Sequence, residues 1–128
     1  MAMNSQKIRV AIVDDKPIFR QSLRSFIEKE PDLGVVAEAE TNLSGIKKVK
    51  EHKPDVVLMK HDMPFTDGLE ETKMVISRLP DTRVIILSRQ SGKNMTATLC
   101  KTWACYHLCR KCSGKEILSA IREGLPLG

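Results

Sequence analysis

The sequence predicts a single α/β domain in which a parallel sheet lies between layers of helices. Its 128 residues fit one domain and are enough to build a hydrophobic core. Five short apolar runs are expected to form strands: Ile8–Val13, Leu33–Ala39, Asp55–Met59, Arg83–Ser88 and Cys105–Cys109. Segments with helical spacing follow these runs in turn, so the strands are expected to be joined by right-handed βαβ crossovers.

The first two helices are predicted from their start signals and their apolar spacing. Pro17 suits the first helical position, and the helix that it opens must end before Pro31. The inward stripe expected on this helix comprises Ile18, Phe19, Ser22, Leu23, Phe26 and Ile27. Asn42 is expected to cap the second helix, which turns Leu43, Ile46 and Val49 inward.

Three more helices complete the alternation. Asp67 to Glu70 opens one whose inward residues are Leu69, Val75, Ile76 and Leu79. Ser91 is expected to cap a weaker helix that runs to about Thr102. The segment from Ser113 to Glu116 has the pattern of a capping box, and Gly124 followed by Pro126 ends this last helix.

Composition and charge exclude several classes of function. The net charge is +5, but the basic residues are dispersed and the chain has one Trp, one Tyr and three Phe for stacking on bases. The densest basic segment, Lys47–Lys53, is interpreted as a solvated helix face, so direct nucleic-acid binding is not expected. The apolar runs are far shorter than the roughly 20 residues that span a bilayer, and no secretory signal is visible. A cytoplasmic location is therefore expected.

Polar residues follow the ends of four predicted strands. They are Asp14, Asp15, Lys60, Ser88 and Arg110. Because functional crevices of parallel sheets lie at the carboxyl ends of strands, these residues define the expected pocket.

Four segments carry a resemblance to a known family. They are VAIVDDKPIFRQSLRSFIEKEPDLGVVAEAET, KPDVVLMKHDMPFTDGLEET, LPDTRVIILS and KEILSAIREG. In combination they resemble the receiver domain of response regulators, within the NarL/FixJ-like branch that couples a receiver to a LuxR-type helix-turn-helix domain. The resemblance implies a doubly wound, flavodoxin-like (βα)5 domain with strand order 2-1-3-4-5. It divides the chain into an N-terminal tail (1–6), a receiver (7–124) and the start of a linker (125–128).

The resemblance also implies a role for each pocket residue. Asp14 and Asp15 match the acidic pair that binds Mg²⁺ in the family, and Ser88 matches the hydroxyl residue that contacts the phosphoryl group. Arg110 stands where the family has a lysine, and His107 stands where an aromatic residue commonly reports the switch. Lys60 occupies the position of the phosphoacceptor aspartate.

This replacement predicts a receiver without phosphoryl chemistry. A protonated lysine offers neither a nucleophile nor an oxygen ligand, and with Arg110 it cancels the formal charge of the acid pair. We therefore expect no enzymatic activity, no cofactor, and Mg²⁺ binding that is lost or weak. The Lys60 ammonium is expected to pair with Asp14 or Asp15 instead of extending into solvent. Two less favoured phosphoacceptors are Asp62 and His61.

The output side of the domain also departs from the family. Trp103 and Tyr106 replace usual glycines near the surface formed by the fourth helix (91–102), the fifth strand (Cys105–Cys109) and the fifth helix, which opens at Ser113–Glu116, and a homodimer is possible through this surface. These departures, with Arg110 and His107, favour natural divergence over a single engineered change. The expected partner is the regulator's own C-terminal DNA-binding domain. Four cysteines gather nearby, at positions 100, 105, 109 and 112, and a thiol or metal sensor is the alternative that they suggest. Buried packing is the favoured reading of these cysteines.

Overall fold

The computed structural model describes residues 7–60, 82–88, 106–109 and 114–123. Within these ranges, the side chains of Asn42, Lys60, Ile86, Ser88, Glu123 and residues 106–109 lie outside the description. The expected helices over 67–79 and 91–102 fall outside the described residues, as do Ser113 and Gly124.

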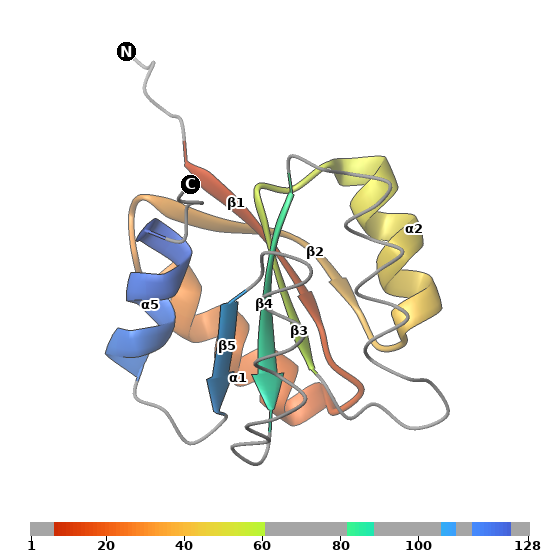
Figure 1. Ribbon diagram of the computed structural model, residues 1–128, viewed down its shortest axis with the longest axis horizontal. Coiled ribbons are helices and arrows are strands. Elements are labelled where there is room, and N and C mark those ends of the chain that lie inside the picture. Colours follow the sequence, from red (N-terminus) through yellow and green to blue (C-terminus); the bar gives the residue numbers. More distant parts are fainter. Residues whose placement is uncertain (1–6, 61–81, 89–105, 110–113, 124–128) are drawn as a thin grey trace.

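Five parallel strands form one sheet in the order β2-β1-β3-β4-β5 (Figure 1). The strands are β1 (Ile8–Val13), β2 (Leu33–Ala39), β3 (Val56–Lys60), β4 (Arg83–Ser88) and β5 (Tyr106–Cys109). The predicted fold class and strand order are therefore confirmed. β3 begins at Val56 instead of Asp55, because Asp55 acts as a polar start to the strand. Its carboxylate accepts a hydrogen bond from the Arg9 backbone N–H at 2.9 Å. The strand also ends one residue later than predicted, so Lys60 is the last residue of β3.

Two apolar clusters fill the two faces of the sheet. Residues alternate along β1, so that Val10 and Ile12 enter one cluster while Ala11 and Val13 enter the other. The first cluster includes Ile27 of α1 (Pro17–Glu28) and Ile121 of α5 (Gly114–Glu123). The second includes Val49 of α2 (Asn42–His52). Helices α1 and α5 thus cover one face and α2 covers the other, as Figure 1 shows.

Three residues that were expected to point inward are exposed, and one of them is Ser22 of α1. Ile18 is 78% exposed because it lies nine positions before Ile27 on the helix, which rotates it by about 180° from that buried position. Leu43 is 68% exposed, on the flank of the helix face that buries Ile46 and Val49. All three predictions were wrong, because residues at helical spacing do not by themselves define the centre of the buried face.

The cap of α2 also differs from the prediction. Thr41 is the N-cap residue, and its hydroxyl oxygen accepts a hydrogen bond from the Ser44 N–H at 3.0 Å. Asn42 is the first helical residue. The helix ends at His52, and the C-cap residue Lys53 adopts the left-handed backbone conformation with φ 47°. On this helix Lys47, Lys50 and Lys53 are exposed, as expected of a solvated face. Lys48 and His52 are half-buried.

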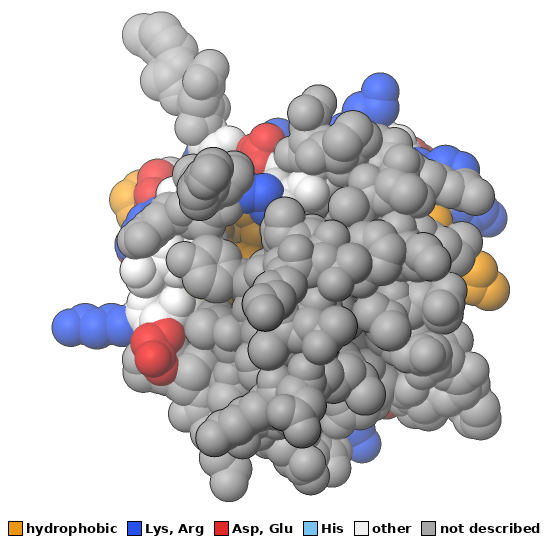
Figure 2. Space-filling view, viewed as in Figure 1, with side chains coloured by type: hydrophobic (Ala, Val, Ile, Leu, Met, Phe, Trp, Pro, Cys, Tyr) orange, Lys and Arg blue, Asp and Glu red, His pale blue; other side chains and the backbone are white. Residues whose placement is uncertain are grey.

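On the visible face of the molecule (Figure 2), the described basic side chains do not gather in one place. On the face drawn in Figure 2, Lys and Arg side chains lie at several separate places around the outline. None of the described helices has the length and hydrophobicity needed to span a lipid bilayer.

Candidate functional site at the strand ends

The acid pair lies at the carboxyl end of β1. Asp14 directly follows the strand and extends its pairing, because its backbone N–H donates to the Ala39 carbonyl of β2 at 2.9 Å. Asp14 is 1% exposed, and Asp15 is half-buried. A buried aspartate at a strand end needs polar partners, since an uncompensated charge in this environment is costly.

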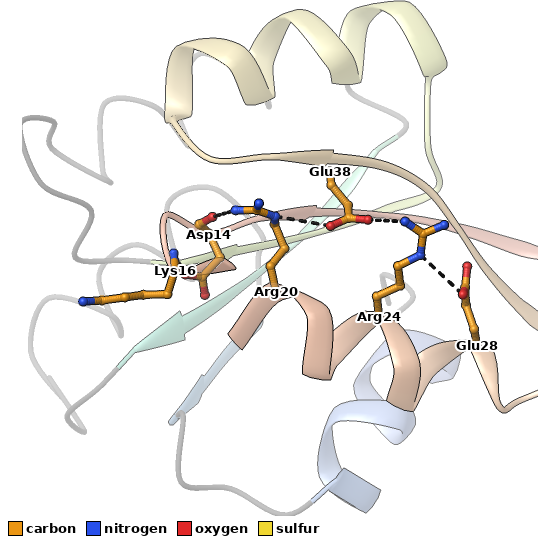
Figure 3. A network of polar contacts seen from close by, with 6 residues as sticks. All are labelled: Asp14, Lys16, Arg20, Arg24, Glu28 and Glu38. Carbon is orange, nitrogen blue, oxygen red and sulfur yellow. Dashed lines mark hydrogen bonds and ion pairs between the residues drawn. The ribbon is translucent and has the colours of Figure 1, made fainter. Parts of the chain in front are cut away.

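Two contacts orient Asp14 from the start of α1 (Figure 3). The Lys16 backbone N–H donates to Oδ1 of Asp14 at 2.9 Å. Nη1 of Arg20 donates to the backbone carbonyl of Asp14 at 2.6 Å. A carboxylate fixed in this way offers acceptor oxygens at a defined place, which suits an ammonium group or a hard metal cation.

Lys60 and Ser88 end the two neighbouring strands. In the ladder between β1 and β3, Val13 pairs with Met59, so the backbone of Lys60 is one residue beyond that pair, as Asp14 is. Lys60 pairs in turn with Leu87, the residue before Ser88. The register therefore brings the backbones of Asp14, Lys60 and Ser88 together where the carboxyl ends of the strands meet. The contact of the Lys60 ammonium with the acid pair stays a prediction, because this side chain lies outside the description.

The remaining predicted site residues are described in part or not at all. His107 lies within β5 and pairs with Ile86, but its side chain is outside the description. Arg110 lies outside the described residues, as do Trp103 and the helix expected over 91–102. Of the four cysteines, only the backbone of Cys109 is described. Among the described residues no group of three or more His, Cys, Asp or Glu could hold a metal ion.

Sequence reasoning missed the charged residues beside the acid pair. Nε of Arg20 donates to Oε1 of Glu38 at 3.2 Å, and Nη1 of Arg24 donates to Oε2 of the same carboxylate. The hydrogen bond with Glu38 raises the pKa of Arg24 above its ordinary value. One signal could have revealed this network. Glu38 is a charged residue between two alanines of a strand that is otherwise apolar, and such a residue usually has a partner.

A groove of about 310 Å³ follows the outer edge of β2. Its lining includes Arg24, Glu38, Lys48 and His52, so both signs of charge are present. Glu38 therefore faces the groove while it also binds Arg20, which contacts the acid-pair residue Asp14.

Comparisons with known proteins agree with this architecture. Residues 10–122 match the model of the response regulator receiver domain. The chain is 31% identical over 120 residues to the transcriptional regulatory protein DegU of Brevibacillus brevis, a match that covers 94% of this chain and 51% of DegU. It thus spans about half the length of this relative.

Two solved structures extend the comparison. The response regulator domain of Thermotoga maritima CheB is similar with a TM-score of 0.83 and 30% identity, covering 94% of this chain and 99% of that one. A LuxR-family two-component response regulator from Aurantimonas sp. SI85-9A1 has a TM-score of 0.84 and 28% identity, covering 91% and 83%.

The sheet order and the acid pair at the end of β1 define a doubly wound α/β domain with an acidic site at the carboxyl ends of its strands. With the match over residues 10–122, the chain belongs to the response regulator receiver domain family.

Proposed function

We propose that this chain is the receiver domain of a two-component transcriptional regulator of the LuxR/NarL type, and that it acts without phosphorylation. It would serve as a regulatory and interaction module, not as an enzyme. In the full-length regulator its partner would be a C-terminal DNA-binding domain. The boundaries that we propose are a tail (1–6), the receiver (7–124) and the start of a linker (125–128).

One observation carries the proposal. Lys60 is the last residue of β3, level in register with Asp14 after β1. The resemblance of the surrounding segment implies that this is the position of the family's phosphoacceptor aspartate. Transfer of a phosphoryl group needs a nucleophile, and a protonated amine has no lone pair to offer. The transfer also needs Mg²⁺ to neutralise charge on the moving group.

The donor set does not fit Mg²⁺ well. Asp14 and Asp15 remain, but the oxygen ligand of a third carboxylate is replaced by the Lys60 side chain. Oδ1 of Asp14 already accepts a hydrogen bond from the Lys16 N–H. Mg²⁺ dehydrates reluctantly and requires nearly ideal octahedral oxygen ligation, so the added cation opposes its binding. We propose that the Lys60 ammonium supplies the counter-charge of the acid pair, with Ser88 and Arg110 completing the degenerate pocket and His107 at the former switch position.

Intact-mass measurement tests this function directly. The chain is incubated with acetyl phosphate and Mg²⁺, and Lys60→Asp is treated in parallel as the matched positive control. We expect the mass of the unmodified chain to stay unchanged while the Lys60→Asp variant gains one phosphoryl group. A phosphoryl adduct on the unmodified chain would refute the proposal, and its loss in Asp62→Asn would identify the loop aspartate as the acceptor.

A further inference from the structure

The loop that carries the acid pair is fixed by protein contacts on several sides. The N–H of Asp14 is bound by the β2 carbonyl of Ala39, and its carboxylate is bound by the N–H of Lys16. Its carbonyl oxygen is bound by the guanidinium of Arg20 at 2.6 Å. Of the three groups that bind Asp14 in these contacts, only the Arg20 guanidinium belongs to a side chain.

The Arg20 side chain is itself held from the opposite side. Its Nε donates to Glu38 while its Nη1 donates to Asp14, so the guanidinium bridges β2 and the loop after β1 (Figure 3). The side chains of Arg20 and Glu38 are 17% and 23% exposed, which limits screening of the pair by solvent. A planar guanidinium can serve two acceptors in fixed directions, whereas a lysine ammonium cannot reproduce that geometry.

We propose that Arg20 is a positioning residue for the acid pair, and that Glu38 holds Arg20 in its productive orientation. The carboxylate of Asp14 is therefore oriented by the protein itself, before any cation binds. Arg24 extends the arrangement. It binds the second carboxylate oxygen of Glu38, and its Nε lies 3.4 Å from Oε1 of Glu28. This chain of contacts links the acid pair to the outer edge of β2.

Replacement of Arg20 has two opposed effects on a cation that binds the acid pair. The variant removes a positive charge near the carboxylates, which by itself would strengthen the binding of any cation. It also releases the Asp14 carbonyl and with it the orientation of the loop, which weakens cation binding. The sign of the change in affinity therefore distinguishes positioning from simple electrostatics.

Amide hydrogen exchange tests the positioning in the otherwise unmodified chain. In Arg20→Gln, exchange of the Lys16 amide is expected to accelerate by about tenfold, the scale set by losing a hydrogen bond to a charged group. The matched control is Arg9→Gln, which removes the same charge and a similar contact, from Nη1 to the Lys53 carbonyl at 2.8 Å. It should leave the Lys16 amide unchanged.

Further variants guard against loss of the fold. Glu38→Gln keeps Arg20 but removes its charged partner, and it should accelerate the same amide to a smaller extent. In Arg20→Lys, the exchange rate of the Lys16 amide should lie between the rates in the unmodified chain and in Arg20→Gln, because the positive charge is retained and the planar guanidinium is lost. Unchanged exchange at Lys16 in a folded Arg20→Gln or Glu38→Gln protein would overturn the proposal.

Metal affinity provides a second test, and this part rests on the proposed function. Mg²⁺ is titrated into Lys60→Asp and into Lys60→Asp with Arg20→Gln. The double variant should bind Mg²⁺ several-fold more weakly despite its lower positive charge, with Arg9→Gln again as the control. Tighter or equal binding would overturn the positioning role. Absence of Mg²⁺ binding by Lys60→Asp itself would refute our account of Lys60, while the exchange measurement would still decide the role of Arg20.

Discussion

Gly45 of α2 and Val13 of β1 lie so close together that a Cβ atom at Gly45 would fall 2.8 Å from Cγ2 of Val13. Val13 is buried and directly precedes the acid pair. The approach of this helix to the sheet therefore depends on a residue without a side chain.

Gly45→Ala is expected to destabilise the domain. The gain in helix propensity is at most about 1 kcal/mol. Overpacking against a stiff, β-branched neighbour costs about 1–3 kcal/mol, so the net change in the free energy of unfolding is negative. Urea denaturation measures it. Gly34→Ala is the control, because its Cβ would meet only Cδ of Lys7 at 3.6 Å. Equal stability of the two variants would contradict the prediction.

Two isoleucines on α1 provide a second test of the fold. Ile27 is fully buried, and Ile27→Ala should lower the free energy of unfolding by about 2–5 kcal/mol through lost burial and a cavity. Ile18→Ala, on the exposed side of the same helix, should change it by less than about 0.5 kcal/mol. Denaturation of both variants under the same conditions checks the pair. A large loss for Ile18→Ala would show that this side of α1 is covered in solution.

The strands were predictable because their physical signal is strong and local. A run such as Val10–Val13 is apolar and β-branched on both faces, which has few solutions other than a buried strand. The exact ends were less predictable, because Asp55 and Thr41 act through specific side-chain hydrogen bonds. Propensity alone does not distinguish Thr41 from Asn42 as a cap, since both residue types serve well.

The candidate site was predictable only as far as topology determines it. Parallel pairing places the backbones of Asp14 and Lys60 together at the carboxyl ends of their strands, independently of where their side chains point. The bridge from Arg20 to Glu38 joins residues 18 positions apart, and its geometry depends on how α1 lies against β2. A linear pattern contains no information on that packing beyond the unusual charge within β2.

The pairing of Arg122 with Asp32 predicts a specific pH dependence. Arg122 binds both oxygens of Asp32 at 2.9 Å, and this hydrogen bonding lowers the pKa of the Asp32 carboxyl. The unfolded chain therefore binds more protons than the folded chain in the acidic range, so stability rises with pH there. The contribution is present above the ordinary Asp pKa of about 3.9 and is lost as the pH falls through the lower folded value.

The corresponding variant is Arg122→Gln. At neutral pH and low salt it should be slightly less stable than the unmodified chain, and the difference should shrink below about pH 4 or in about 1 M salt. The effect is small because the pair lies at the surface. Urea denaturation as a function of pH measures it, with Asp32→Asn expected to remove the same dependence. A difference that persists unchanged at low pH would exclude this ion pair as its source.

Lys60→Asp is expected to restore metal binding without a normal conformational response. The change adds an oxygen ligand and makes the pocket more acidic, so Mg²⁺ affinity should appear. A switch, however, requires a ligand that contacts its two states differently. As the resemblance implies, Arg110 would present a planar fork where the family has a compact ammonium, and His107 would stand in place of the reporter aromatic residue.

The Lys60→Asp variant is titrated with Mg²⁺ and then with beryllofluoride. Two readouts are followed: dimerisation, and the fluorescence of Trp103, which is the single tryptophan. Lys60→Asn is the control, because it removes the cation without adding a carboxylate, and its Mg²⁺ affinity should stay below that of Lys60→Asp. We expect saturable Mg²⁺ binding, little change in Trp103 fluorescence and no dimerisation. A large change in Trp103 fluorescence together with dimerisation on addition of beryllofluoride would instead mean that the output side of the domain is intact and that Lys60 alone keeps the domain from switching.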